Sequence, residues 1–376
     1  MNIARVMAGT ASAAIMALTI GSAALNMAAD NLSNNLTTVE KDTKDTGTTD
    51  TTDTIDKPPT DLRIAETENQ PINILVGGSD SRAASGNQYG NQNVHQGARL
   101  DTTIFIHIPA DRSEATAVSI PRDTWVSLPD CVVRPGIGLT SIEGRETKFN
   151  AAFDLSGIAC TTKLVEQMTG LTVDHFAVID FEGFKQAIDE LGGVEMCIPA
   201  PIVDRDSGLT LDAGIQTLTG EQALGFVRAR KTLGDGSDIS RIGRQQDFLK
   251  ALLARISSAE TLTNPLATYR FLDAASQGLT VDRELGEKEA IFELASILSE
   301  VNPGAVKFVT LPWVPRGDGA NVVVNEVEAK KLWDQMKQGG ATETKKPTVR
   351  APNRSAAIPG VGSESLKTIE PDGTCI

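Results

Sequence analysis

The sequence predicts an α/β fold, with one main domain in which a mixed sheet is covered by helices on both faces. Short apolar runs that end at glycine or proline alternate along the chain with longer amphipathic stretches, and this pattern is typical of strands alternating with helices. Two early apolar runs are separated only by residues 109–114, so we expect them to pair as an antiparallel hairpin. Such a pair excludes a purely parallel sheet.

The predicted strands are short and mostly apolar. The run at 72–76 is closed by Gly77 and Gly78, and the run at 194–198 is stopped by Pro199. The full set of predicted strands is 72–76, 102–108, 115–120, 175–179, 194–198, 306–311 and 322–324.

The predicted helices carry recognisable start and stop signals. Gly170 and the pair Gly192-Gly193 follow two of them, as expected for helix C-termini. Thr219 with Gln222 forms a capping box at the start of a third. The full set of predicted helices is 148–153, 161–168, 181–191, 219–227, 239–256, 292–298 and 326–336.

The N-terminal residues favour a membrane anchor. Residues 3–29 contain one charged residue, Arg5, and a transmembrane helix needs about 20 mostly apolar residues. Small residues at 27–29 leave a cleaved signal peptide as the alternative, although the apolar core of a signal peptide spans only about 7–15 residues. Arg5 and the free amine favour an N-terminus inside the cell. Either interpretation exports the rest of the chain.

The sequence divides into four regions on this basis. We expect a cytoplasmic stub and transmembrane anchor at 1–36, followed by a Thr/Asp-rich linker at 37–70 that cannot bury apolar surface. The main domain is expected at 71–338, and a flexible tail at 339–376. The predicted location is the cell membrane, with a single pass and an extracellular main domain.

Charge and motifs exclude several function classes. The net charge of −14 argues against binding to nucleic acid, which requires a broadly basic surface. The sequence lacks the phosphate-binding loop of nucleotide hydrolases, the H-E-x-x-H zinc motif and the G-x-S-x-G nucleophile motif. Of the three histidines, His107 and His175 lie within predicted strands, where a structural role is the simpler interpretation, and His95 lies in a polar loop.

Four cysteines suggest two disulfides. None forms a C-x-x-C pair or zinc-ligand spacing, and an even number is typical of exported proteins. Three pairings are open, and free thiols are the alternative. We favour Cys131–Cys160, which would close a polar insert, and Cys197–Cys375, which would hold the tail.

A helix face rich in arginine is the most informative chemical feature. Arg241, Arg244, Gln245 and Phe248 share one face of the predicted helix 239–256. Phe248 indicates that this face is turned toward the protein. The helix macrodipole disfavours cations in the first turns, so arginines there indicate that an anion binds at that end. Guanidinium groups bind phosphate oxygens bidentately.

Two aspartates accompany the arginines at strand ends. Asp80 follows the first predicted strand, and Asp101 begins the next. Two interpretations are open: ion-pair partners of the arginines, or ligands of Mg²⁺, which takes one or two carboxylates together with substrate phosphate oxygens. No side chain stands out as a general base.

These residues lie in a series of short motifs with a fixed order. The motifs are Gly78-Ser79-Asp80-Ser81-Arg82, Arg99-Leu100-Asp101-Thr102, Ser119-Ile120-Pro121-Arg122-Asp123, Lys148-Phe149-Asn150-Ala151-Ala152, Gly192-Gly193-Val194, Leu218-Thr219-Gly220-Glu221-Gln222-Ala223-Leu224, Val227-Arg228-Ala229-Arg230, and Asp238 through Arg241, Arg244 and Gln245. In this order the chain resembles the LytR-CpsA-Psr family of cell-envelope phosphotransferases over about residues 72–256, and more weakly to 336.

The resemblance implies a fold and a set of residue roles. The family fold is an α-β-α sandwich with a mixed central sheet. Asp80 and Asp101 would hold Mg²⁺, with Mn²⁺ as an alternative. The residues expected to act on the pyrophosphate are Arg99, Arg122, Arg228, Arg230 and Arg241 at the reacting groups, with Arg82, Lys148, Arg244 and Gln245 as further substrate contacts. For Arg244, pairing with Asp238 is an open alternative.

The resemblance also implies an activity. Family members move a sugar phosphate from a polyprenyl-pyrophosphate carrier onto peptidoglycan. The cysteine placement resembles that of members from high-GC Gram-positive bacteria. In mycolate-bearing relatives the polymer is arabinogalactan, which is the expected donor glycan here. A pyrophosphatase with water as acceptor and a non-catalytic binder of lipid-linked glycans are the alternatives. The long polar loop at 83–98 and the insert at 129–145 depart from the simplest family pattern.

Overall fold

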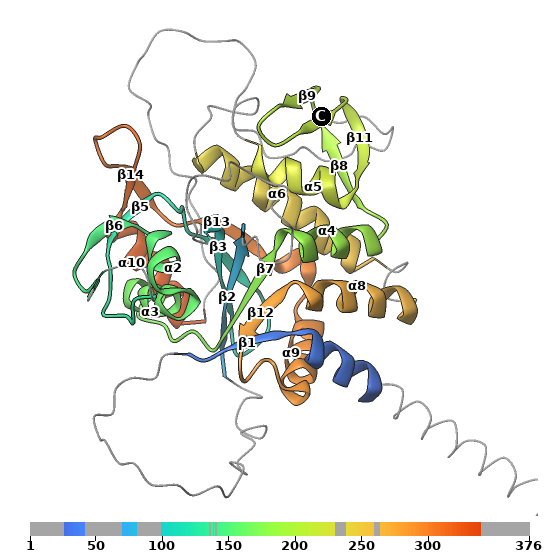
Figure 1. Ribbon diagram of the computed structural model, residues 1–376, viewed down its shortest axis with the longest axis horizontal. Helices are drawn as coiled ribbons and strands as arrows, with labels where there is room; N and C mark the ends of the chain where they lie inside the picture. The colour runs from blue at the N-terminus through green and yellow to red at the C-terminus, as the bar shows by residue number, and fades with distance from the viewer. Residues whose placement is uncertain are drawn as a thin grey trace, which may run out of the picture.

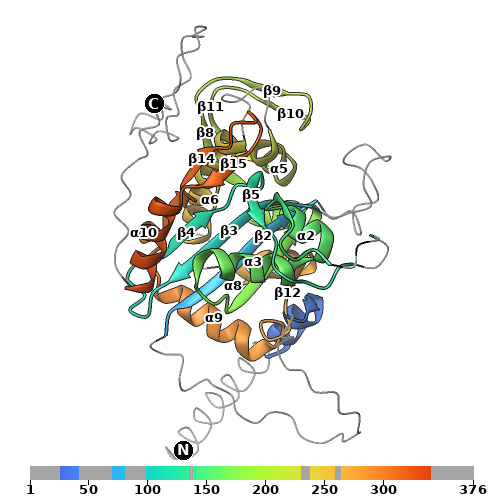
Figure 2. The ribbon, with the colours of Figure 1, turned by 90° about the vertical axis from the view of Figure 1, so that its left-hand side faces the viewer.

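A seven-stranded mixed sheet forms the centre of the molecule (Figures 1 and 2). The computed structural model of the protein describes residues 26–41, 70–80, 99–134, 137, 139, 141–229, 238–258 and 264–339. The strand order is β1 (Thr37–Val39), β12 (Leu279–Asp282), β7 (His175–Asp180), β2 (Ile72–Ser79), β3 (Leu100–Ile108), β4 (Thr116–Ser119) and β13 (Lys307–Thr310). The predicted antiparallel pair, β3 with β4, is present at the predicted position.

Helices lie on both sides of this sheet, as Figure 1 shows. On one side are α2 (Ala151–Ser156), α3 (Ile158–Thr169) and α10 (Glu326–Lys337), and on the other are α4 (Phe181–Glu190), α8 (Pro265–Gln277) and α9 (Lys288–Glu300). The predicted α/β class, with a mixed central sheet between helices, is confirmed.

The alternation of side chains along the strands divides the core between the two faces. Leu75 and Phe105 are opposite each other on β2 and β3, and both are fully buried. The Phe105 ring meets the ring of Trp333 on α10 edge-on, with centroids 6.2 Å apart. Ile74 belongs to a second cluster on the face covered by α9. The period-two pattern of the sequence therefore places one set of side chains on each face.

A smaller lobe stands at one end of the sheet (Figure 1). It contains β8 (Val194–Ile198), β9 (Ile202–Asp204), β10 (Leu209–Leu211), β11 (Gly214–Leu218), α5 (Gly220–Arg228) and α6 (Asp238–Ile256). The Thr219–Gln222 capping box at the start of α5 is present. Gln246 of α6 donates hydrogen bonds to the hydroxyls of Ser119 and Thr310, which fixes α6 against β4 and β13.

A four-stranded sheet forms the rim beside the ends of β3 and β4. Its order is β14 (Trp313–Pro315), β15 (Val322–Val324), β5 (Thr124–Ser127) and β6 (Glu146–Lys148). The predicted helix at 148–153 begins three residues late, because Lys148 pairs with Trp125 in the ladder between β5 and β6 and only Ala151 starts α2.

The N-terminal boundary of the domain differs from the prediction. A helix occupies residues 26–35, and β1 pairs in parallel with β12, so residues 26–41 belong to the fold instead of to an anchor and a linker. Polar contacts attach this helix to the domain. Asn31 and Asn35 donate hydrogen bonds to Asp273 on α8, and Asp30 pairs with Lys288 on α9. Within the described residues no helix is both long and apolar enough to cross a membrane. Predicted anchor residues 1–25 lie outside them.

Sequence patterns gave no indication of α8. Only Ala274 and Ser276 of this helix are buried, so it lacks a strong apolar stripe. It packs against α4 through a close backbone contact, where a Cβ on Gly183 would lie 2.5 Å from Cα of Gly278. Small residues allow this approach, and they carry no hydrophobic periodicity from which to predict it.

The predicted disulfide between Cys131 and Cys160 is confirmed. It joins the insert before β6 to α3 across a sequence separation of 29 residues. Cys197 is also disulfide-bonded. Its predicted partner, Cys375, lies outside the described residues.

We expect loss of the Cys131–Cys160 bond to cost about 3–4 kcal/mol of unfolding free energy, because the oxidised bond removes loop entropy from the unfolded chain. The Cys131→Ser/Cys160→Ser double variant should therefore unfold at lower urea concentration than the wild type under oxidising conditions. Equal midpoints for the two proteins would contradict this expectation.

Candidate functional site

The charged motifs lie at the ends of three neighbouring strands, at the same end of the central sheet. β2 and β4 both run antiparallel to β3, so their C-terminal ends flank its N-terminal end. Asp80 follows β2, Arg99 and Asp101 lie at the start of β3, and Arg122 follows β4. The backbone N–H of Asp80 donates to the carbonyl of Arg99 at 3.1 Å, which fixes the first two ends side by side.

The turn that presents Arg122 is held by its own hydrogen bonds. The backbone N–H and the hydroxyl of Thr124 both donate to the carbonyl of Pro121, at 3.0 and 2.7 Å. The N–H of Asn150, at the start of α2, donates to the carbonyl of Arg122. Arg122 therefore has a fixed backbone on which its side chain can be oriented.

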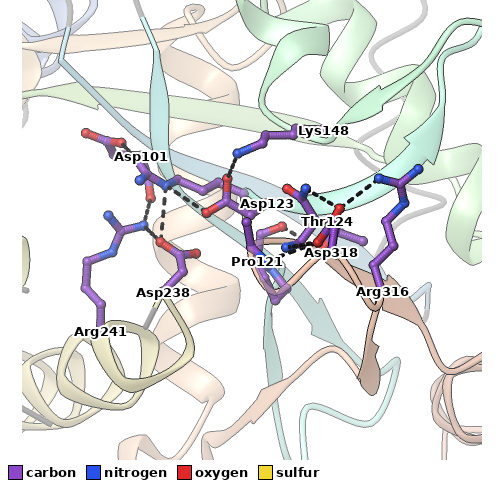
Figure 3. Close-up of polar contacts among 12 residues, drawn as sticks. Asp101, Pro121, Asp123, Thr124, Lys148, Asp238, Arg241, Arg316 and Asp318 are labelled. Carbon is purple, nitrogen blue, oxygen red and sulfur yellow. Dashed lines mark hydrogen bonds and ion pairs between the residues drawn. The ribbon is translucent and has the colours of Figure 1, made fainter. Parts of the chain in front are cut away.

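Arg122 is the centre of an ion-pair network (Figure 3). Its guanidinium lies 2.5 Å from Asp101 Oδ1 and 3.1 Å from Asp238 Oδ1, with Asp123 Oδ2 at 3.8 Å. Lys148 Nζ donates to Asp123 Oδ1 at 2.7 Å. With Arg241, which pairs with Asp238, three cations from different elements face three carboxylates.

Burial and charge oppose each other at Arg122. The side chain is only 16% exposed. Desolvation by burial acts to lower the pKa of Arg122, but the carboxylates of Asp101, Asp238 and Asp123 outweigh it and raise the pKa above its usual value. Arg122 therefore stays fully charged.

The network is incompletely hydrogen-bonded. Among the described residues, Nε of Arg122 and both carboxylate oxygens of Asp238 are buried and have no hydrogen bond of good geometry, although their charges are close. Buried polar atoms without hydrogen bonds raise the free energy of the folded state by about 1–3 kcal/mol each. Ion pairs, and not well-aligned hydrogen bonds, therefore hold Asp238 between Arg122 and Arg241.

Arg241 connects α6 to the strand ends. It is 3% exposed, and Nη2 donates to the backbone carbonyl of Asp101 at 3.0 Å and contacts Asp238 Oδ1 at 2.5 Å. Gln245 and Phe248 on the same face are also buried. The arginine-bearing face of the helix is turned toward the protein, as the spacing predicts.

Two further residues of α6, Gln245 and Arg244, were expected to contact the substrate. Both donate hydrogen bonds to backbone carbonyls of the protein. Gln245 Nε2 donates to the carbonyl of Val227 at 3.1 Å, and Arg244 donates to the carbonyl of Ala229. These carbonyls lie at the C-terminal end of α5, where unpaired backbone oxygens attract donors and cations. Asp238 pairs with Arg122 and Arg241, and the suggested pairing of Arg244 with Asp238 stays a prediction.

The other predicted cations lie around the network. Arg99 is half-buried at the start of β3. Arg228, in the last turn of α5, places its guanidinium carbon 4.6 Å from the centroid of the Phe181 ring. Arg82 and Arg230 lie outside the described residues, and the predicted roles of all nine basic and amide residues stay predictions.

Asp80 and Asp101 have the donor chemistry that Mg²⁺ requires. Asp80 Oδ1 accepts from the backbone N–H of Arg99 at 2.6 Å, and Asp101 Oδ1 pairs with Arg122. Two carboxylates at adjacent strand ends fit an ion that completes its shell with substrate phosphate oxygens and water. Within the described ranges, no group of three or more His, Cys, Asp or Glu side chains forms a site that the protein could fill alone.

The two described histidines serve the fold. His107 Nδ1 lies 2.7 Å from Asn73 Oδ1, and burial lowers the pKa of His107. His175 Nδ1 lies 3.2 Å from Asp282 Oδ1, and Asp282 also accepts the N–H of Phe176. Both histidines are at the ends of β3 and β7 away from Asp101, so their predicted structural role agrees with their position.

The sequence predicts no role for Asp123 and suggests Asp238 only as a partner of Arg244, although both lie in the family motifs. The available signal was their position directly beside Arg122 and three residues before Arg241. Ion pairs between residues beside β4, on β6 and on α6 can be identified only from the structure, because these elements are far apart in the chain.

The fold and the site together define an α/β domain with a cluster of arginines and aspartates at the end of its mixed sheet. Residues 30–338 match the model of the LytR_cpsA_psr family, so the chain belongs to this family.

Known relatives agree with this assignment. The chain is 35% identical over 272 residues to the probable cell wall biosynthesis protein LcpB of Corynebacterium glutamicum. The aligned region covers 70% of this chain and 61% of LcpB. The chain is 29% identical over 238 residues to the polyisoprenyl-teichoic acid–peptidoglycan teichoic acid transferase TagV of Bacillus subtilis. The aligned region covers 62% of this chain and 55% of TagV. The chain thus spans less than two thirds of the length of these relatives.

A solved structure shares the fold. The crystal structure of protein gbs0355 from Streptococcus agalactiae superposes with a TM-score of 0.59 at 21% identity, over 75% of this chain and 92% of that chain. At this level of identity the likeness concerns the fold alone.

Proposed function

We propose that this protein transfers a phosphate-linked glycopolymer from a polyprenyl-pyrophosphate carrier to peptidoglycan. The observation that carries the proposal is the network around Arg122, in which Arg122, Arg241 and Lys148 come from three elements to one strand edge. A pyrophosphate is a compact polyanion that can replace the carboxylates as their partner. TagV is named as a transferase of teichoic acid to peptidoglycan, which supports the same reaction class.

The reaction assigned here is an in-line displacement at phosphorus. The oxygen of an acceptor sugar hydroxyl attacks the phosphorus that bears the glycan, and the hydroxyl proton passes to solvent water. The bond from that phosphorus to the bridging oxygen breaks, and prenyl phosphate leaves with the electron pair. Arg122 and Arg241 stabilise the charge on the transferring and leaving phosphates, as preorganised donors do in phosphoryl transfer.

Asp80 and Asp101 are the residues that we propose to hold Mg²⁺. A bound divalent cation supplies charge neutralisation to phosphate oxygens. The chain's own contribution is to present both carboxylates at adjacent strand ends, with Asp101 held in its pair with Arg122.

The glycan and the location are part of the proposal. LcpB, a relative from Corynebacterium glutamicum, is a probable cell wall biosynthesis protein, which supports a cell wall polymer. Arabinogalactan as the donor glycan is proposed on the family resemblance of the sequence alone. A prenyl-linked donor resides in the membrane, so the apolar residues 3–24 are proposed to hold an extracellular catalytic domain there.

The full-length protein in detergent is the material for the test. A sugar-bearing prenyl pyrophosphate is incubated with and without Mg²⁺ and a peptidoglycan acceptor, and both prenyl phosphate release and glycan transfer are measured. We expect transfer that depends on acceptor and on Mg²⁺. Release that is unaffected by acceptor would identify a pyrophosphatase instead, and the absence of any cleavage would leave a non-catalytic binder.

We expect the Asp101→Asn and Arg228→Ala variants to lose transfer by about 10²–10³-fold, because each removes charge that acts on the phosphates. Arg283→Ala is the matched control, since Arg283 is 73% exposed and pairs with Glu40 at the far edge of the sheet. Wild-type rates in Asp101→Asn and Arg228→Ala together would refute the site assignment.

A further inference from the structure

A continuous row of side chains crosses the four-stranded rim sheet and ends at the ion-pair network. Val314 pairs with Val323, Val323 pairs with Trp125, and Trp125 pairs with Lys148. Side chains of directly paired residues lie on the same face of a sheet. We call these four residues the rim row.

The rim row faces outward. Thr124 and Val126, the neighbours of Trp125 on β5, are buried and point into the core, so Trp125 lies on the opposite face. Val314 is 41% exposed, and the side chain of Lys148 is also 41% exposed. An apolar strip that begins at a phosphate-binding cation is therefore open to a ligand.

A rigid arginine covers part of this strip. The guanidinium carbon of Arg316 lies 3.7 Å from the centroid of the Trp125 ring, and Nη1 pairs with Asp318 at 2.8 Å. Asp318 also accepts the N–H groups of Ala320 and Asn321, which closes the loop between β14 and β15. The guanidinium is held by a ring below it and a carboxylate beside it before any ligand binds.

The guanidinium of Arg316 keeps donors for a ligand. The guanidinium has five N–H groups, and one of them, on Nη1, donates to Asp318. Among the described residues the guanidinium has no other hydrogen-bond acceptor. Figure 3 shows Arg316 and Asp318 on the side of Asp123 that is opposite to Asp238 and Arg241. Arg316 is thus a cation directed at substrate groups other than those that Arg241 reaches.

The spacing matches one sugar ring. Adjacent strands are roughly 4.8 Å apart, so Trp125 stands about one strand spacing from Lys148. Lys148 reaches the network through Asp123. A sugar joined to a phosphate that binds at Lys148 would therefore reach the Trp125 ring, and its hydroxyls would reach Arg316.

We propose that Trp125 and Arg316 form a subsite for the sugar that is joined directly to the donor phosphate. Arg316, stacked on the face of the Trp125 ring, donates hydrogen bonds to the sugar oxygens, and the half-buried indole contacts the sugar with the part of its edge that the guanidinium does not cover. The inference rests on the proposed function. A prenyl chain is a poorer match, because the strip is bordered by two cations, Lys148 and Arg316, that an uncharged chain cannot satisfy.

The test compares two ligands on the full-length protein in detergent. One is a prenyl pyrophosphate that carries a sugar, and the other is the prenyl pyrophosphate without the sugar. We expect Trp125→Ala and Arg316→Ala each to weaken binding of the sugar-bearing ligand at least 10-fold and to leave binding of the sugar-free ligand within 2-fold. Trp125→Phe, which retains an aromatic ring, should restore most of the affinity.

The sugar-free ligand also reports whether each variant is folded. Phe292→Ala, on α9 and 46% exposed, is the matched control for loss of an exposed aromatic side chain and should behave as wild type with both ligands. Equal weakening for both ligands, or no weakening for either, would overturn the subsite. A wild-type protein that discriminates between the ligands but transfers no glycan would refute the proposed function and retain the subsite.

Discussion

Arg122→Ala is expected to lower glycan transfer by about 10²–10³-fold and also to lower the unfolding free energy. The catalytic loss follows because Arg122 is the cation at the meeting point of β3, β4 and α6, where it would stabilise charge on the transferring phosphate. The loss of stability follows because Asp101, Asp123 and Asp238 would face one another without their shared cation. Removing one partner of a buried ion pair costs about 3–5 kcal/mol.

Solvent screening reduces that cost here, since Arg122 is 16% exposed and Asp101 22%. The two effects can be separated with Arg122→Lys. Lysine keeps the charge, and so most of the stability, but cannot bind three groups in the plane of a guanidinium. We expect Arg122→Lys to unfold close to the wild-type urea midpoint while transfer remains strongly reduced. Full transfer by the lysine variant would show that Arg122 acts only as a point charge.

Deletion of residues 26–41 is expected to destabilise the domain by on the order of 3–6 kcal/mol. Side chains of these residues make six hydrogen bonds to α8 and to the turn after β12, in addition to the β1–β12 ladder. Each such bond contributes about 0.5–1.5 kcal/mol net. The deletion also leaves β12 as an open edge, which favours aggregation.

The matched control for this deletion is removal of residues 42–57, a segment of the same length from the predicted linker. Urea unfolding followed by circular dichroism should show a lower midpoint for the first deletion and an unchanged midpoint for the second. Equal midpoints for the two deletions would mean that β1 and the preceding helix add nothing to the stability of the domain.

Local sequence signals were sufficient for much of the fold. The apolar runs that end at Gly77 and before Pro199 became β2 and β8, and the Thr219 capping box starts α5. Two of the missed elements, β1 and α8, have a common cause. β1 is a strand of polar residues that is stabilised by a partner 243 positions away, since Thr37 pairs with Thr280, and α8 is held by the contact between Gly183 and Gly278. Neither contact leaves a periodic pattern in the local sequence.

The same distinction applies to the site. The helical spacing of Arg241, Gln245 and Phe248 predicts which face is buried, and that face is buried. The individual partners depend on elements distant in sequence: Gln245 contacts the end of α5, and Arg241 contacts the backbone of β3. The counter-ions Asp123 and Asp238 could be identified only when α6, β4 and β6 were placed together.

The pairing of β1 with β12 also determines when folding can be completed. The N-terminal strand at 37–39 cannot dock until residues 279–282 have been synthesised and have reached the same compartment, and β4 must likewise wait for β13. Contacts between such distant parts of a chain make folding slow, because a long loop must close before the contact stabilises it. If the chain is exported unfolded, the central sheet is therefore assembled from its middle strands outward, and its two edges form last.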